Sequence, residues 1–203
     1  MNRVGWIILG IIVVIVGLFI SMTDFGVADG DQASGRLNAR RFDPVAVVVE
    51  RVTPTVRELT VPVAGVGRSA ISDSWGDARE GGTRAHHGTD IMAPAGTPVV
   101  AAAAGTVEKL FRSERGGITV YVRSPARRWT YYYAHLAGYA AGLEEGQGVR
   151  RGTLLGYVGD TGDAGAGNHH LHFGMTRNRP TDRWWQGQDV NPYPLLAGKG
   201  AGR

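Results

Sequence analysis

The stretch Gly167-Asn168-His169-His170-Leu171-His172-Phe173-Gly174-Met175 places two histidines one residue apart. Side chains of a β-strand alternate between its two faces, so His170 and His172 would point to the same side of a strand. One imidazole of such a pair can bind a metal ion while the other stays available for proton transfer. The stretch therefore predicts a strand that carries a candidate metal site.

Short apolar runs surround this stretch and predict further strands. They occupy residues 98–104, 106–111, 118–123, 129–135 and 153–158. Residues 124–128, which include Pro125, are a plausible hairpin connection. The 31 glycines indicate turns between strands rather than long helices. About 140 to 180 residues outside the N-terminal segment suffice for one domain with its own core. We expect an all-β domain.

The other histidines fall in two further clusters that can complete a metal site. His86 and Asp90 are four residues apart and share a face of either an extended or a helical segment. His135 ends a predicted strand. A catalytic zinc ion takes three protein ligands and leaves one position open. His86, Asp90 and one histidine of the 170/172 pair make such a set, which leaves the other histidine and His135 for proton transfer or oxyanion stabilisation.

The combined motifs resemble the lysostaphin/LytM-type zinc metallopeptidases, which cut peptide bonds in bacterial peptidoglycan. The matching stretches are His86-x-Gly88-x-Asp90, Ala93-Pro94-x-Gly96-Thr97-Pro98-Val99, Gly105-x-Val107, Tyr133-Ala134-His135-Leu136, Gly156-x-Val158-Gly159-x-Thr161-Gly162 and His170-Leu171-His172-Phe173. The resemblance runs from about Val61 to Leu196.

This resemblance implies a twisted antiparallel sheet with a groove. It also implies that His86, Asp90 and His172 bind Zn²⁺ and that His135 and His170 are catalytic histidines that do not bind the metal. The expected substrates are peptide cross-links of peptidoglycan. The sequence departs from the family pattern at Trp75, where Phe is usual, and at Gly174, where an acidic residue is common. Neither departure removes a metal ligand, and both leave the details of the substrate groove open.

Several neighbouring residues are expected to have lesser roles. His87 and His169 are adjacent to candidate site residues and would point to the opposite face, so we expect neither to bind the metal. Tyr131 and Tyr133 have the parity of His135, and either lining of the groove or packing in the core fits them. The Gly/Asp-rich loop 159–168 lacks a lysine at phosphate-loop spacing and is expected to form a groove rim.

Residues 4–23 contain no charged side chain. Twenty helical residues span roughly 30 Å, the thickness of the hydrocarbon core of a bilayer. Arg3 precedes this segment and no Lys or Arg follows before Arg36. The charge asymmetry predicts a single-pass anchor, residues 1–23, with the C-terminal domain on the exported side. A cleaved signal peptide is the alternative.

The remaining boundaries follow from composition. Residues 24–58 are expected to be a linker or arm, residues 59–197 the metallopeptidase domain and residues 198–203 a disordered tail. Residues 36–61 have a mixed apolar character and could lie in the groove and block it, which is a hypothesis of autoinhibition.

Composition excludes some classes of site and partner. The absence of cysteine excludes disulfides and cysteine–zinc sites. A net charge of +4 without a dense basic run gives no indication of nucleic-acid binding. Two alternatives to a peptidoglycan endopeptidase remain: a non-catalytic peptidoglycan-binding regulator or scaffold, and a zinc peptidase that acts on exported proteins.

Overall fold

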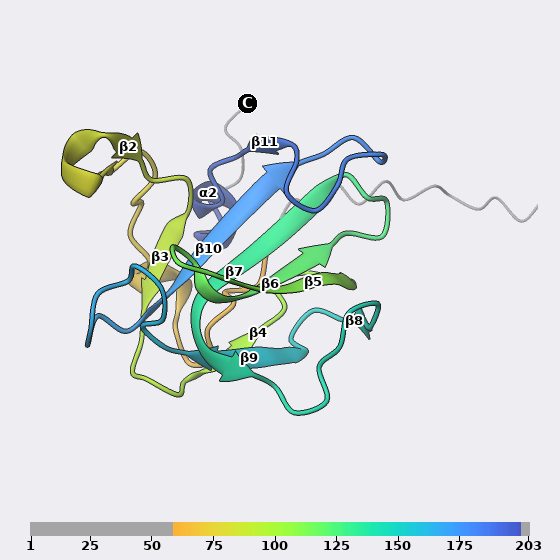
Figure 1. Cartoon of the computed structure of the whole chain (residues 1–203), viewed down its shortest axis with the longest axis horizontal. Coiled ribbons are helices and arrows are strands. Elements are labelled where there is room, and N and C mark those ends of the chain that lie inside the picture. Colours follow the sequence, from red (N-terminus) through yellow and green to blue (C-terminus); the bar gives the residue numbers. More distant parts are fainter. Residues whose placement is uncertain (1–58, 200–203) are drawn as a thin grey trace, which may run out of the picture. The chain divides into compact units, whose positions relative to one another are not determined.

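The computed structural model describes residues 59–199, and strands dominate this part of the chain (Figure 1). The strands are β1 (Ala78–Arg79), β2 (Arg84–Ala85), β3 (Thr89–Met92), β4 (Pro98–Val100), β5 (Gly105–Ser113), β6 (Gly117–Arg123), β7 (Trp129–Tyr139), β8 (Gly148–Val149), β9 (Leu154–Val158), β10 (His170–Arg177) and β11 (Gln188–Asp189). The described helical segments are η1 (Arg68–Ala70), η2 (Glu80–Gly82) and α2 (Tyr193–Leu196). The prediction of a domain built mainly of strands is confirmed.

Nine strands form one sheet, and its pairings are antiparallel. The main path runs in the order β11-β10-β7-β6-β5-β8, while β3 pairs with β10 and β9 pairs with both β4 and β7. Figure 1 shows the long strand β7 curving from its place beside β10 towards β9. One edge of β10 is thus paired with β7, and β3 lies along the first half of its other edge.

Strand β10 separates the core from the candidate site by alternation of its side chains. Leu171 and Phe173 are fully buried in the apolar core. Burial of side chains of this size contributes about 1.5 to 3 kcal/mol each relative to exposure. His170 and His172 point to the other face. A register slip of one residue would move the histidines into the core, so the apolar pair fixes the register that presents them.

The predicted hairpin is present and connects β6 to β7. The N–H of Ser124 donates to the carbonyl oxygen of Trp129 over 2.9 Å, and the N–H of Trp129 donates to Ser124 Oγ over 3.0 Å. The predicted strand 98–104 is shorter than expected, because only Pro98–Val100 pairs as a strand. Beyond it, Ala102 is buried, and its N–H donates to the hydroxyl of Tyr133 over 2.9 Å.

A β-bulge in β7 changes which side chains face the candidate site. Ile118 pairs with Leu136 but Val120 pairs with Tyr133, so β7 contains one residue more than β6 between these pairs. His135 has φ of 60°, the left-handed conformation that non-glycine residues rarely adopt. The bulge breaks the period of two, so Tyr131 and Tyr133 lie in the core rather than in the groove.

The start of the described chain packs against the core. Leu59 is fully buried, and the N–H of Thr60 donates to the carbonyl oxygen of Ala102 over 3.0 Å. No helix within residues 59–199 is long and apolar enough to span a bilayer. The predicted anchor 1–23 and linker 24–58, and most of the predicted tail 198–203, lie outside the described residues.

Candidate metal centre

Strands β3 and β10 bring Asp90 and His172 directly opposite each other. Residues that pair across two antiparallel strands point to the same face, so both side chains lie on the side of the sheet away from the core. His86 approaches from the segment between β2 and β3. Its Nε2 lies 3.0 Å from Asp90 Oδ1 and 2.8 Å from His172 Nδ1, and His172 Nδ1 lies 3.1 Å from Asp90 Oδ1.

This triangle of donor atoms fits a divalent metal ion. Two ring nitrogens and a carboxylate oxygen are ligands that zinc takes, and donor atoms on a tetrahedral zinc ion lie roughly 3.3 Å apart. The observed separations of 2.8 to 3.1 Å need to widen by only a few tenths of an ångström. Lone pairs converging at such spacing also repel one another unless a proton or a cation lies among them. Among the described residues, these three form the group that can hold a metal ion.

Hydrogen bonds behind the triangle orient its members. Nδ1–H of His86 donates to the carbonyl oxygen of Ser74 over 2.6 Å, which leaves Nε2 with a lone pair for a metal. The guanidinium of Arg79 pairs with Oδ2 of Asp90, so Oδ1 is the oxygen turned towards the histidines. The N–H of Asp90 donates to Ser74 Oγ over 3.0 Å. The segment before β2 thereby supports two of the three donor groups.

Burial and mutual contact change the acidity of the donor groups. Burial by itself would raise the pKa of Asp90, but its close contacts with His172 and His86 outweigh burial and hold that pKa far below its usual range. Burial lowers the pKa of His172, against the opposing effect of Asp90. At neutral pH the site therefore offers an ionised carboxylate and a neutral His172, the forms that bind metal ions.

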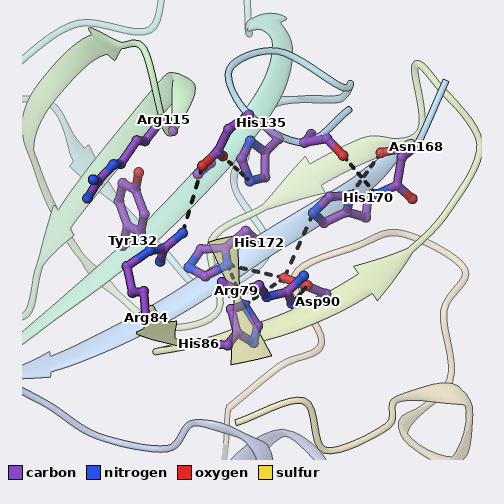
Figure 2. A pocket seen from close by; sticks show the side chains of 14 residues that line it. Arg79, Arg84, His86, Asp90, Arg115, Tyr132, His135, Asn168, His170 and His172 are labelled. Carbon is purple, nitrogen blue, oxygen red and sulfur yellow. Dashed lines mark hydrogen bonds and ion pairs between the residues drawn. The ribbon is translucent and has the colours of Figure 1, made fainter. Parts of the chain in front are cut away.

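His135 and His170 lie beside the triangle, with ring centroids 4.9 Å apart (Figure 2). Nδ1–H of His135 donates to the carbonyl oxygen of Thr161 over 2.8 Å, and Nδ1–H of His170 donates to that of Asn168 over 2.9 Å. Both rings are thereby held in the tautomer whose Nε2 carries a lone pair. Nε2 of His170 lies 3.8 Å from Asp90 Oδ1. Burial lowers the pKa of His135.

The bulge in β7 and the loop 159–168 together position His135. Its N–H donates to the carbonyl oxygen of Gly116 over 2.8 Å. Thr161 Oγ1 donates to the carbonyl oxygen of Leu136 over 2.8 Å and accepts from the N–H of Ile118 over 3.0 Å. Thr161 thus connects the loop to β6 through Ile118 and to β7 through Leu136, while its carbonyl oxygen accepts the hydrogen bond from His135. A left-handed residue fixed this way is typical of functional sites.

The five predicted site residues line one cavity of about 370 Å³. The structure thus brings all of them together, while their individual roles stay predictions. The other charged and polar side chains that line it are Arg79, Arg84, Arg115, Tyr132, Asp163 and Asn168. The loop 159–168 contributes to the rim, as expected. His87 points elsewhere, with its ring stacked on Trp75 at 5.2 Å and its Nδ1 3.0 Å from Asp189 Oδ2.

Sequence reasoning missed several of these lining residues. Regular alternation along β7 would place Tyr131 and Tyr133 on the same face as His135. The bulge breaks this alternation, so Tyr132 lines the cavity instead. Asp163 belongs to the Gly/Asp-rich loop 159–168, and its Oδ1 lies 3.9 Å from His135 Nε2. Arg84 precedes His86 by two residues, and this spacing places both side chains on one face of an extended segment. The sequence therefore does contain a signal for Arg84. Arg115 lies in a turn, and no periodicity indicates its direction.

Comparison with known proteins agrees with this geometry. The sequence model described as peptidase family M23 matches residues 84–192. The L-Ala--D-Glu endopeptidase of Bacillus subtilis (strain 168) is 39% identical over 129 residues, which are 61% of this chain and 38% of that protein. The peptidoglycan DD-endopeptidase ShyC of Vibrio cholerae is 34% identical over 113 residues, 54% of this chain and 25% of that protein. The chain therefore spans well under half the length of both relatives.

A solved structure extends the agreement to the fold. The catalytic domain of the antimicrobial peptidase lysostaphin from Staphylococcus simulans matches with a TM-score of 0.51 at 28% identity. The match covers 62% of this chain and 90% of that chain. The mostly β fold is lysostaphin-like, as the motif resemblance implied.

Proposed function

Because the chain belongs to peptidase family M23, we propose that it is a zinc-dependent endopeptidase that hydrolyses peptide cross-links of bacterial peptidoglycan. The observation that carries this proposal is the convergence of His86, Asp90 and His172 beside two further histidines with available Nε2 atoms. The name of the relative ShyC, a peptidoglycan DD-endopeptidase, supports the substrate class.

The donor set favours zinc over harder cations. Two imidazole nitrogens with one carboxylate oxygen suit zinc, whereas calcium and magnesium prefer sites built from oxygen atoms. When bound, zinc supplies Lewis-acid chemistry: it acidifies water and polarises the carbonyl group of the scissile peptide. In this proposal His86, Asp90 and His172 hold the ion, and Arg79 keeps the Asp90 carboxylate turned towards it.

The two remaining histidines move the protons of the reaction. Hydrolysis needs one proton taken from the attacking water and one proton delivered to the leaving amine nitrogen. A neutral histidine with Nδ1–H bound to a backbone carbonyl can accept the first proton at Nε2 and then donate it. Either His135 or His170 can take this role. The other histidine, when its Nε2 is protonated as well, can donate a hydrogen bond from Nε2–H to the oxyanion that forms as the carbonyl carbon becomes tetrahedral.

Burial suits His135 to the first of these roles. Its lowered pKa keeps the ring neutral at physiological pH, so Nε2 is ready to accept a proton. The bond from Nδ1–H to Thr161 prevents the ring from turning over. His170 then faces the reacting carbonyl from the β10 side of the cavity.

The N-terminal segment extends the proposal to location. We infer that residues 4–23 anchor the protein in the membrane with the domain on the exported side. The support is the length of the uncharged segment and the position of Arg3 before it. An exported domain can reach peptidoglycan directly.

Digestion of purified muropeptides tests the proposed function. The zinc-loaded full-length chain is incubated with cross-linked muropeptides, and the products are identified by mass spectrometry. We expect products that have gained one water at a peptide bond, and no products with the His172→Ala variant. A folded, zinc-loaded protein that binds muropeptides without cleaving them would favour the regulator or scaffold instead. Cleavage of exported proteins but not of muropeptides would favour a peptidase of different specificity.

A further inference from the structure

A row of aromatic rings leads from the cavity across the sheet to the loop between β10 and β11. Each ring contacts the next, in the order His172, Tyr132, Tyr121, Trp184 and Trp185. We propose that the outer end of this row, formed by Phe111, Trp184 and Trp185, binds a saccharide ring of the glycan chain that carries the substrate peptide. This inference rests on the proposed function and adds a second contact with the substrate to it.

The aromatic row is continuous with the lining of the cavity. Tyr132 lines the cavity, and its ring centroid lies 5.8 Å from that of His172 (Figure 2). Tyr121 pairs with Tyr132 across β6 and β7, with ring centroids 4.7 Å apart, so both rings lie on the face of the sheet that holds the metal centre. Trp184 packs on Tyr121 at 4.8 Å and on Phe111, in β5, at 5.1 Å. A ligand in the cavity can therefore continue along the row.

Gly174 keeps the start of the row open. It pairs with Tyr132 across β10 and β7, and a Cβ at Gly174 would lie 3.2 Å from Cδ1 of the tyrosine ring. A longer side chain at this position would stand up from the sheet beside that ring. The glycine therefore leaves the face of the sheet accessible between the metal centre and the outer aromatic side chains.

Large apolar side chains are exposed at the outer end of the row. Trp185 is 56% exposed and Phe111 is 38% exposed. Trp184 lies against both, with ring centroids 5.1 Å apart in each pair. Exposed aromatic side chains that gather next to a candidate active site are typical of a surface that binds a ligand.

The loop between β10 and β11 presents Trp185 in a fixed orientation. Arg123 is buried, and its Nη2 donates to the carbonyl oxygen of Asp182 over 3.2 Å. The guanidinium carbon of Arg183 lies over the ring of Trp185, 5.2 Å from its centroid. A side chain that is already ordered loses little conformational entropy when it binds a ligand.

A saccharide ring fits this surface in shape and in chemistry. Its faces consist of C–H groups, and its edges carry hydroxyl and amide groups. The C–H groups pack favourably on the negative face of an aromatic ring. Gln186 is exposed next to Trp185 and offers an amide group to the polar edge of a sugar. An open aromatic face suits such a ring better than a single apolar peptide side chain, which binds best in a pocket.

The length of the row matches a short peptide between the sugar and the scissile bond. From β10 through β7 and β6 to β5 the row crosses three strand spacings, roughly 14 Å. An extended peptide covers this distance with about four residues. In peptidoglycan a short peptide joins the glycan chain to the cross-link. The cross-link and the sugar can therefore contact the two ends of the row at the same time.

A matched pair of substrates tests the saccharide contact. Two cross-linked peptides differ only in the disaccharide at the start of the peptide, which is present in one and removed in the other. The zinc-loaded full-length chain is expected to cleave the substrate with the disaccharide at a roughly 2- to 10-fold lower KM, the order expected for one stacked ring, with similar kcat. Trp185→Ala should abolish this difference, and Trp185→Phe should retain part of it. Leu154→Ala, which removes an exposed apolar side chain from β9 outside the cavity lining, is the matched control and should preserve it.

Binding of a tetramer of N-acetylglucosamine to the zinc-loaded full-length chain, measured by NMR, separates the two proposals. Equal KM values for the two substrates and no binding of the tetramer would overturn the saccharide contact, while the endopeptidase assignment would stand. Tetramer binding that is lost in Trp185→Ala, without cleavage of either substrate, would support the inference and overturn the assignment. A KM difference that survives in Trp185→Ala would overturn the inference. An equal rise in KM for both substrates in that variant would also overturn it, because the surface would then bind peptide.

Discussion

Gly88 lies directly against the imidazole of His172. A Cβ added at Gly88 would be 2.5 Å from Cε1 and 2.7 Å from Nε2 of that ring, and 2.9 Å from the carbonyl oxygen of Phe173. Real side chains do not tolerate such contacts, so the ring can occupy its place only because residue 88 has no side chain. The glycine between His86 and Asp90 is therefore required for the geometry of the third donor.

Gly88→Ala is expected to displace His172. We expect metal affinity to fall on the order of 10- to 100-fold, and the free energy of unfolding to decrease by about 1 to 3 kcal/mol because the strands must separate slightly. Gly148→Ala is the control, since a Cβ at that position meets no atom within 4 Å. Isothermal titration with zinc and thermal unfolding measure both effects. Unchanged affinity in Gly88→Ala would contradict this role.

Arg79→Gln tests the support of the Asp90 carboxylate. The guanidinium pairs with Oδ2, and its loss should allow the carboxylate to rotate away from the histidines. We expect a 10- to 100-fold loss of metal affinity, the usual order for a group that orients a ligand. A chelator-competition assay measures the change. If Arg79→Gln bound zinc as tightly as the wild type, the ion pair would have no part in holding the metal.

His135→Asn and His170→Gln separate proton transfer from metal binding. Asparagine tolerates the left-handed backbone of residue 135, so the bulge should survive. Each variant should keep one zinc ion per chain and lose about 10²- to 10⁴-fold in kcat. His87→Gln is the control, because its ring lies outside the cavity lining. Loss of zinc from His170→Gln would instead identify that residue as a ligand.

The protonation of His172 in the metal-free chain tests the environment of that ring. Zinc needs the neutral ring, and burial lowers the pKa of His172 below the ordinary value of about 6.5. At His172, protons therefore compete with zinc only at pH values below that lowered pKa, and the Asp90 carboxylate stays ionised across the same range. NMR of the His172 ring between about pH 8 and about pH 5 should show its midpoint of protonation below about 6.5. A midpoint above about 6.5 would contradict the expected direction.

Much of the site could be predicted because it depends on short-range spacing. The single residue between His170 and His172 fixes their common face on a strand. The choice of His172 as the ligand opposite Asp90 came from the family resemblance, because the two residues lie far apart in the sequence. The hairpin between β6 and β7 follows from two apolar runs around Pro125. These features arise from local alternation and turn chemistry, which the sequence expresses directly.

The parts that were missed depend on irregular backbone and on loop closure. The bulge in β7 inserts one residue at His135, and no residue type there indicates positive φ. It turns Tyr132, instead of Tyr131 and Tyr133, towards the cavity. Arg115 reaches the cavity because the loop 159–168 packs on its turn, with Gly162 against the Arg115 carbonyl oxygen. Contacts between distant segments of this kind leave no periodic pattern.

Zinc titration of the metal-stripped full-length chain, followed by muropeptide cleavage, tests the central claim most directly. We predict that activity rises linearly and saturates at one zinc per chain, and that His172→Ala neither binds zinc tightly nor recovers activity. A stripped wild type that cleaves muropeptides as fast as the loaded protein, or a His172→Ala variant that recovers fully, would contradict the claim.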